Sequence, residues 1–195
     1  MLHNKLKTMQ TNTIKLLALF FISSLALTSC SSDDDGNGGE NDEELITTVV
    51  LTLTNTTDAT DVVVLTFTDL DGEGGAPGVY SPAVSTLSAN TTYSGSIQLL
   101  NATENPAENI NEEIEAEADE HEFFYTSTAG ITITKTDTDG NGNPLGITTT
   151  VATGAATSGN LTAVLKHEPM KPNNGTAGDA GGSTDVEVSY SVNVQ

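Results

Sequence analysis

A short stretch of oxygen-bearing side chains is the first candidate site in this sequence. It contains Asp137, Asp139, Asn141 and Asn143. Oxygen ligands at every second position, with a glycine such as Gly142 for the sharp turn, begin a calcium loop of the EF-hand type. Thr148 occupies the twelfth position, where such a loop carries a bidentate glutamate. Two interpretations stay open, a weak calcium site or a tight strand connection rich in Asp, Asn and Gly.

Two histidines form the second candidate site. Both His121 and His167 are flanked by glutamate, and the flanking residues are Glu120, Glu122 and Glu168. Imidazole and carboxylate groups are ligands of Zn²⁺ and of similar divalent ions, so these residues predict a metal site if the two histidines meet. The alternative is that each histidine ends a strand and caps the core through hydrogen bonds, without a metal. The only cofactor that we expect is therefore a divalent cation, zinc or calcium.

The single cysteine predicts where the protein resides. An apolar run from Leu16 to Leu27 follows three lysines and leads into Thr28-Ser29-Cys30, which is the layout of a secretory signal. A cysteine at this point resembles a bacterial lipoprotein signal, in which the thiol is acylated and the chain is cut before the cysteine. The run is also shorter than the roughly 20 residues that a membrane-spanning helix needs. We therefore predict an outer-membrane protein, lipid-anchored at Cys30, that faces the periplasm or the cell exterior. The alternative is an ordinary signal peptide with a chance cysteine.

The acidic composition and the scarcity of thiols exclude several classes of function. All 27 acidic residues follow Cys30 and are accompanied by only three lysines, so the field of the chain repels nucleic acid and attracts cations. Once Cys30 is acylated, no thiol remains for disulfides, thiolate metal sites or nucleophilic catalysis. The sequence contains no Gly-x-Ser-x-Gly and no phosphate-binding glycine loop. We therefore predict that the protein is not an enzyme.

The chain divides into three segments, of which the last must position the two candidate sites. We expect a signal peptide at 1–29, the lipidated cysteine with a disordered acidic tether at 30–44, and a folded domain at 45–195. Within the domain, apolar residues recur with period two in short runs that turn residues separate. The runs are 49–54, 63–68, 79–86, 93–101, 121–128, 131–136, 145–153, 160–167 and 185–194. Pro82 predicts that the third run is an edge strand.

The pattern changes between Asn105 and Glu120, where glutamate dominates and apolar residues recur every four positions. We predict one short helix here, capped by Asn109 with Glu112 as its partner. The predicted fold is therefore all-β: a single antiparallel β-sandwich, immunoglobulin-like, with about nine strands and one short acidic helix.

The order of these strands predicts that the candidate sites lie close together. If the four strands from 121–128 to 160–167 alternate in direction, the first begins and the fourth ends at the same end of the sandwich. The loop 137–144 lies at that end as well, and so does the acidic helix, which leads directly into His121. Two imidazoles and several carboxylates are therefore expected to converge there.

Four stretches of the chain occur in an order that is familiar from a bacterial family. They are 119–125 (DEHEFFY), 137–147 (DTDGNGNPLGI), 165–169 (LKHEP) and 182–188 (GSTDVEV). Together with the signal, they resemble small bacterial lipoproteins labelled "type 1 periplasmic binding fold superfamily protein". The label implies a solute-binding protein with two α/β lobes, whereas the period-two pattern predicts an all-β domain. The resemblance covers most of the chain and assigns no ligand residues.

These observations lead to two hypotheses about function. The first is an outer-membrane or cell-surface lipoprotein that acts as a non-enzymatic binding module for a divalent metal or a metal-bearing solute. Its expected partners are the membrane, through the lipid, and an envelope protein or outer-membrane receptor. The second is a structural or interaction lipoprotein of the cell envelope with no small ligand, whose acidity keeps it soluble. Metal uptake by the purified domain separates the two.

Overall fold

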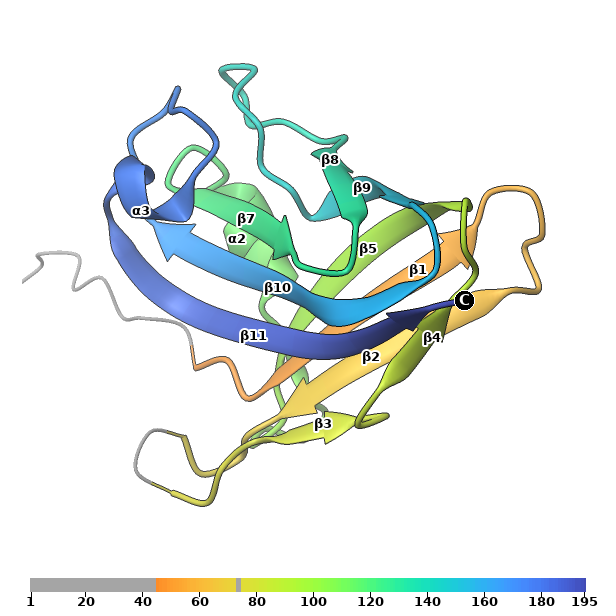
Figure 1. Cartoon of the computed structure of the whole chain (residues 1–195). Helices are drawn as coiled ribbons and strands as arrows, with labels where there is room; N and C mark the ends of the chain where they lie inside the picture. The colour runs from red at the N-terminus through yellow and green to blue at the C-terminus, as the bar shows by residue number, and fades with distance from the viewer. Residues whose placement is uncertain (1–44, 73–74) are drawn as a thin grey trace, which may run out of the picture. The chain divides into compact units, whose positions relative to one another are not determined.

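Alternating apolar residues build two β-sheets whose inner faces form one core (Figure 1). The computed structural model describes residues 45–72 and 75–195. The predicted signal peptide, Cys30 and the tether up to residue 44 lie outside the described residues. In strand β1 (Thr48–Asn55), Val49, Leu51 and Leu53 are buried, while the residues between them face outward and are half-buried. This alternation is what the two-residue repeat of a strand produces when only one face meets the core.

The first sheet has seven strands. They are β1, β2 (Val62–Thr68), β3 (Val79–Ser81), β5 (Thr92–Asn101), β6 (Glu108–Asn109), β8 (Ile131–Lys135) and β9 (Thr148–Thr153). Their order is β3-β2-β1-β5-β9-β8, and β6 pairs with the far end of β5. All the pairs in this sheet are antiparallel.

The second sheet has four strands. They are β4 (Ser85–Leu87), β7 (His121–Ser127), β10 (Thr157–His167) and β11 (Ser183–Val194), in the order β4-β11-β10-β7. The pairs β7–β10 and β10–β11 are antiparallel, and β11 pairs with β4 in parallel. The all-β sandwich predicted from the sequence is confirmed.

The number of strands differs from the prediction, because the described residues contain eleven rather than about nine. The run 79–86, predicted as one strand, is divided between the two sheets: β3 ends at Ser81 and β4 begins at Ser85. Pro82 lies in the connection, where its missing N–H breaks no ladder. Both β3 and β4 are edge strands, so the edge position predicted from Pro82 is confirmed.

The acidic helix is shorter than predicted. Helix α2 (Asn111–Ala116) replaces the helix expected over 105–120, and Asn109 belongs to β6 rather than to an N-cap. The Asn111 side chain explains where the helix begins, because its amide oxygen accepts from the Leu99 N–H (2.6 Å) and its amide nitrogen donates to the Ile97 carbonyl (2.9 Å). These buried bonds tie the first residue of α2 to β5. A second helix, α3 (Ala177–Ala180), interrupts the loop predicted over 169–182. Neither of the two helices in the described part of the chain is long and apolar enough to span a membrane.

Two tyrosines connect the sheets across the core. The Tyr190 hydroxyl on β11 donates to the Val49 carbonyl on β1 at 3.1 Å, and its ring packs edge-on against Tyr80 at 5.6 Å. Burial raises the pKa of the Tyr190 phenol, and Tyr80 adds to this rise. Tyr190 therefore remains a neutral donor across the physiological range.

Candidate metal centre

The end of the sandwich where β7 begins and β10 ends brings the two histidines together. The two strands are antiparallel, and their register pairs His121 directly with His167. The rings are stacked, with centroids 4.6 Å apart and an interplanar angle of 29°. Both side chains point into the sandwich and are almost fully buried, at 0% and 1% exposure. The convergence expected from the strand order is therefore present for this pair.

Asp185 joins the two histidines, although the sequence did not single it out. One ligand atom from each of His121, His167 and Asp185 lies within 4.8 Å of the others, and both carboxylate oxygens of Asp185 are buried. A β-bulge explains the approach: Leu165 pairs with Val186 and Lys166 pairs with Thr184, so Asp185 is an extra residue in β11. Such a bulge turns one side chain away from the face that alternation would assign to it.

The backbone fixes which nitrogen of His121 can bind a metal. Its Nδ1 lies 3.2 Å from the carbonyl oxygen of Glu117, in the turn that follows α2. Because a carbonyl only accepts, Nδ1 donates its hydrogen in this contact, so a metal would bind at Nε2. A metal-binding histidine commonly makes this bond through its other ring nitrogen.

Two of the predicted glutamates lie at the solvent side of the histidines. Glu120, His167 and Glu168 form a second group of ligand atoms within 4.8 Å of one another, and both glutamates are exposed. The Glu120 carboxylate lies 3.8 Å from Nε2 of His167. His167 thus belongs to both an exposed and a buried group of ligand atoms.

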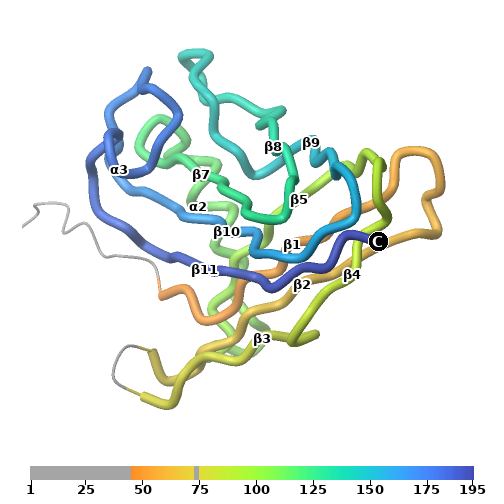
Figure 2. The backbone as a smooth tube through the Cα atoms, in the orientation of Figure 1, coloured from red at the N-terminus to blue at the C-terminus, as the bar shows by residue number. Residues whose placement is uncertain are grey.

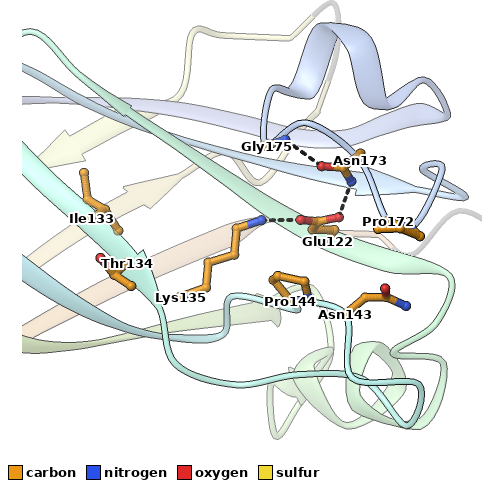
Figure 3. Close-up of a pocket in the computed structure, with 9 residues that line it drawn as sticks. All are labelled: Glu122, Ile133, Thr134, Lys135, Asn143, Pro144, Pro172, Asn173 and Gly175. Atoms are coloured by element: carbon orange, nitrogen blue, oxygen red, sulfur yellow. Dashed lines mark hydrogen bonds and ion pairs between the residues drawn. The ribbon is translucent and has the colours of Figure 1, made fainter.

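The third predicted glutamate, Glu122, does not join this group. It follows His121 in β7, so its side chain lies on the opposite face, where it forms an ion pair with Lys135 and accepts from Asn173 Nδ2 at 2.6 Å (Figure 3). These side chains line a cleft of about 360 Å³ together with Ile133, Thr134, Asn143, Pro144, Pro172 and Gly175. Glu122 therefore belongs to a separate polar cluster.

Lys135 has an unusual environment in this cleft. Its Nζ lies 4.4 Å from the centre of the Phe124 ring, and its side chain is only 17% exposed. Burial lowers the pKa of Lys135, and the hydrogen bond and charge of Glu122 oppose this shift in part. The ammonium is therefore easier to deprotonate than that of a surface lysine.

The loop 137–144, predicted as either a calcium site or a tight connection, uses its carboxylates internally. The two oxygens of Asp137 accept from the backbone N–H groups of Gly146 (2.7 Å) and Thr148 (3.0 Å). Asp139 is buried and accepts from the backbone of Asn141 and Asn143. These contacts favour the tight connection, and calcium binding remains a prediction that would require these bonds to be exchanged.

A cation of the protein itself lies beside one carboxylate of this loop. The Asp139 carboxylate accepts from the Asn143 side chain (3.1 Å) and lies 3.4 Å from Lys171 Nζ. Burial alone would raise the pKa of Asp139, but the bonds from Asn143 and Asn141 and the charge of Lys171 outweigh it, so the pKa is lowered. Lys171 also donates to the Ala118 carbonyl at 2.6 Å. The loop and the segment that precedes α3 therefore lie side by side, as Figures 1 and 2 show.

Comparison of the chain with protein-family models, with curated proteins and with solved structures found no match.

Proposed function

We propose that this chain is a lipid-anchored, non-enzymatic binding module of the cell envelope that holds one divalent metal ion. The observation that carries the proposal is the buried set of His121, His167 and Asp185, whose ligand atoms lie within 4.8 Å of one another. Tetrahedral zinc sets adjacent ligand atoms about 3.3 Å apart, so binding requires the three side chains to close by small rotations.

The ligand set favours a borderline metal over calcium. Two imidazole nitrogens and one carboxylate suit Zn²⁺ and similar ions, whereas Ca²⁺ takes six to eight oxygen ligands. Three protein ligands leave a fourth position for water, for Glu120 or for a donor atom of a metal-bearing solute. The acidic surface of the chain raises the local concentration of any cation.

The proposal also includes a lipid anchor at Cys30 and a partner protein in the cell envelope. Acylation of Cys30 would hold the domain at the outer membrane, facing the periplasm or the cell exterior, where an envelope protein or receptor would exchange the ion or its solute. The lipoprotein signal supports this location, and the acidic chain argues against nucleic acid as a partner.

A structural role in the envelope is the alternative, and one observation favours it. The two imidazoles are stacked and buried, which is also how a pair of histidines would fill the end of a core without a metal. The two functions differ in what the domain does when metal is added.

Calorimetric titration of Zn²⁺ into residues 45–195 tests the proposal. We expect one ion per chain in the wild type, and at least a tenfold loss of affinity in each of His121→Ala, His167→Ala and Asp185→Asn. Glu187→Gln is the matched control, since Glu187 is an exposed carboxylate on the same strand as Asp185 and should bind as the wild type does. Equal heats in the wild type and in Asp185→Asn would contradict the metal site and favour the structural role.

A further inference from the structure

One carboxylate in the cleft of Figure 3 bridges a lysine and an asparagine. Glu122 Oε1 pairs with Lys135 Nζ, and Glu122 Oε2 accepts from Asn173 Nδ2 at 2.6 Å. Glu122 is 2% exposed, while Lys135 and Asn173 are half-buried, so both contacts are partly shielded from water. An amine, an amide and a buried carboxylate in contact with both are the groups that amide exchange requires.

We propose that Lys135 and Asn173 join in an intramolecular isopeptide bond and that Glu122 is the catalytic residue. The site is distinct from the histidines and does not depend on a metal. It uses side chains that the chain itself supplies, and it needs no oxidant, reductant or cofactor.

The reaction balances with ammonia and one proton as its by-products. Glu122 takes a proton from the Lys135 ammonium, and the neutral Nζ adds to Cγ of Asn173, which forms the new C–N bond. The protonated Glu122 then gives its proton to Nδ2, and the bond between Cγ and Nδ2 breaks. Nζ still carries one proton too many, which it gives to Glu122 and which then passes to the departing ammonia. The lysine amine and the asparagine amide thus become one secondary amide, Glu122 is again a carboxylate, and one ammonium ion leaves.

The surroundings favour each step. The burial of the Lys135 side chain disfavours the charged ammonium and so promotes the nucleophilic amine. The backbone N–H of Gly175 donates to Asn173 Oδ1 at 2.8 Å, which is the oxygen that becomes negative when the amine adds. A donor already in place at that oxygen stabilises the intermediate. Asn173 Nδ2 also donates to the Met170 carbonyl at 2.9 Å, so the amide is held in one orientation.

The bond would connect the two sheets at an edge where no ladder joins them. Lys135 ends β8, an edge strand of the first sheet, and Glu122 lies on β7, an edge strand of the second. Asn173 belongs to the loop between β10 and α3. The cross-link would therefore close this side of the sandwich covalently.

Mass spectrometry of the full-length chain, purified from cells, tests the proposal. We expect a protein lighter by one ammonia than its processed sequence. Proteolysis should yield a branched peptide that joins Lys135 to Asn173, and trypsin should not cut after Lys135, because its amine is then an amide. Wild-type peptides that end at Lys135, with an intact Asn173 and no ammonia lost, would overturn the proposal. This measurement is made on the wild-type protein, so it does not depend on whether a variant folds.

Variants assign the roles of the three residues. Lys135→Arg keeps the positive charge beside Glu122 but has no amine to react, so the branched peptide should be lost completely. Glu122→Gln should retain both reacting groups and lose the bond. The control Asn174→Ala changes the neighbouring asparagine and should leave the branched peptide at the wild-type level. A branched peptide of unchanged abundance in Glu122→Gln would contradict the catalytic role of Glu122.

Discussion

At the scale of single residues, the few cations of this acidic chain gather at the end of the sandwich that holds the histidines. Of the three lysines that follow Cys30, Lys135 pairs with Glu122 and Lys171 lies beside Asp139. Lys166 donates to the Gly182 carbonyl and to Thr184, each at 2.9 Å, next to the bulge that places Asp185. The buried carboxylates Glu122 and Asp139 of the neighbouring cleft and loop thus each lie beside a lysine. Asp185 belongs to the group with His121 and His167 on which the proposed metal site depends.

Asp139 should contribute to stability in a way that depends on pH. Asp139→Asn removes the charge that Lys171 faces and weakens buried hydrogen bonds, so we expect a loss of about 1–3 kcal/mol in the free energy of unfolding at pH 7. Because the pKa is lowered in the folded state, the contribution of the charge is fully present above the unfolded value of about 3.9 and is lost as the pH falls through the folded value. Urea unfolding of both proteins at pH 7, 5 and 3 measures this change.

Asp58→Asn is a suitable control for this experiment, because Asp58 is an exposed carboxylate in the β1–β2 hairpin. It should change stability less than Asp139→Asn at pH 7. A difference between wild type and Asp139→Asn that stays constant down to pH 3 would contradict the role assigned to the charge.

At the scale of elements, the alternation of apolar residues predicted most strands, and the alternating direction of four successive strands predicted the meeting of the two histidines. The alternation of faces along a strand places Glu122 opposite His121, so its absence from the group of His121, His167 and Asp185 follows from the sequence. Asp185 could not be found this way, because Val186, Val188 and Tyr190 assign it to the outer face. The bulge that turns it inward is set by pairing with β10 and leaves no mark in a two-residue repeat.

Two other differences between the predicted and the observed elements also arise from contacts that a local sequence pattern does not show. A change of sheet between β3 and β4 does not interrupt the apolar pattern, so 79–86 was predicted as one strand. The helix over 105–120 was predicted too long because local spacing does not show that Asn111 binds the backbone of β5. In each case the deciding contact joins residues that are distant in the sequence, and only the assembled sheets reveal it.

Gly182 should be required for the geometry of the bulge. Its φ is +67°, and an added Cβ would lie 2.0 Å from the His167 carbonyl oxygen. Gly182→Ala is therefore expected to lower the free energy of unfolding by more than about 1 kcal/mol, because alanine is strained in this conformation and clashes with backbone. It should also weaken Zn²⁺ binding, since it displaces the strand that supplies Asp185. Chemical denaturation and calorimetry measure the two effects.

Gly178→Ala provides the matched control. Gly178 lies in helix α3, and an added Cβ there meets nothing within 4 Å. Alanine should leave Zn²⁺ binding unchanged and should raise stability by about 0.5–1 kcal/mol, because it restricts the unfolded chain. Equal stability of the two variants would show that the close approach of Gly182 to His167 is not required.

At the scale of the whole molecule, the proposed anchor makes a prediction about location. Each buried CH₂ of an acyl chain contributes about 0.8 kcal/mol to membrane binding, and two chains or more give a stable anchor. We expect Cys30→Ala to move the protein from the membrane fraction to the soluble fraction of the cell, measured by fractionation and immunoblotting. Ser31→Ala keeps the cysteine and should remain with membranes. A Cys30→Ala protein that stays membrane-bound after washing would contradict the lipoprotein assignment.

The position of β11 in the chain has a consequence for the order of events during the proposed export. β11 follows every other strand of the described residues, and it pairs with β10 and, in parallel, with the much earlier β4. A chain that crosses a membrane with its N-terminus first delivers His121 and Lys135 well before Asn173 and Asp185. Neither the metal site nor the cross-link can then be completed on the far side until Asn173 and Asp185 have crossed. The ion that binds would be chosen by the compartment in which the chain folds, and the cross-link would mark a molecule whose translocation has finished.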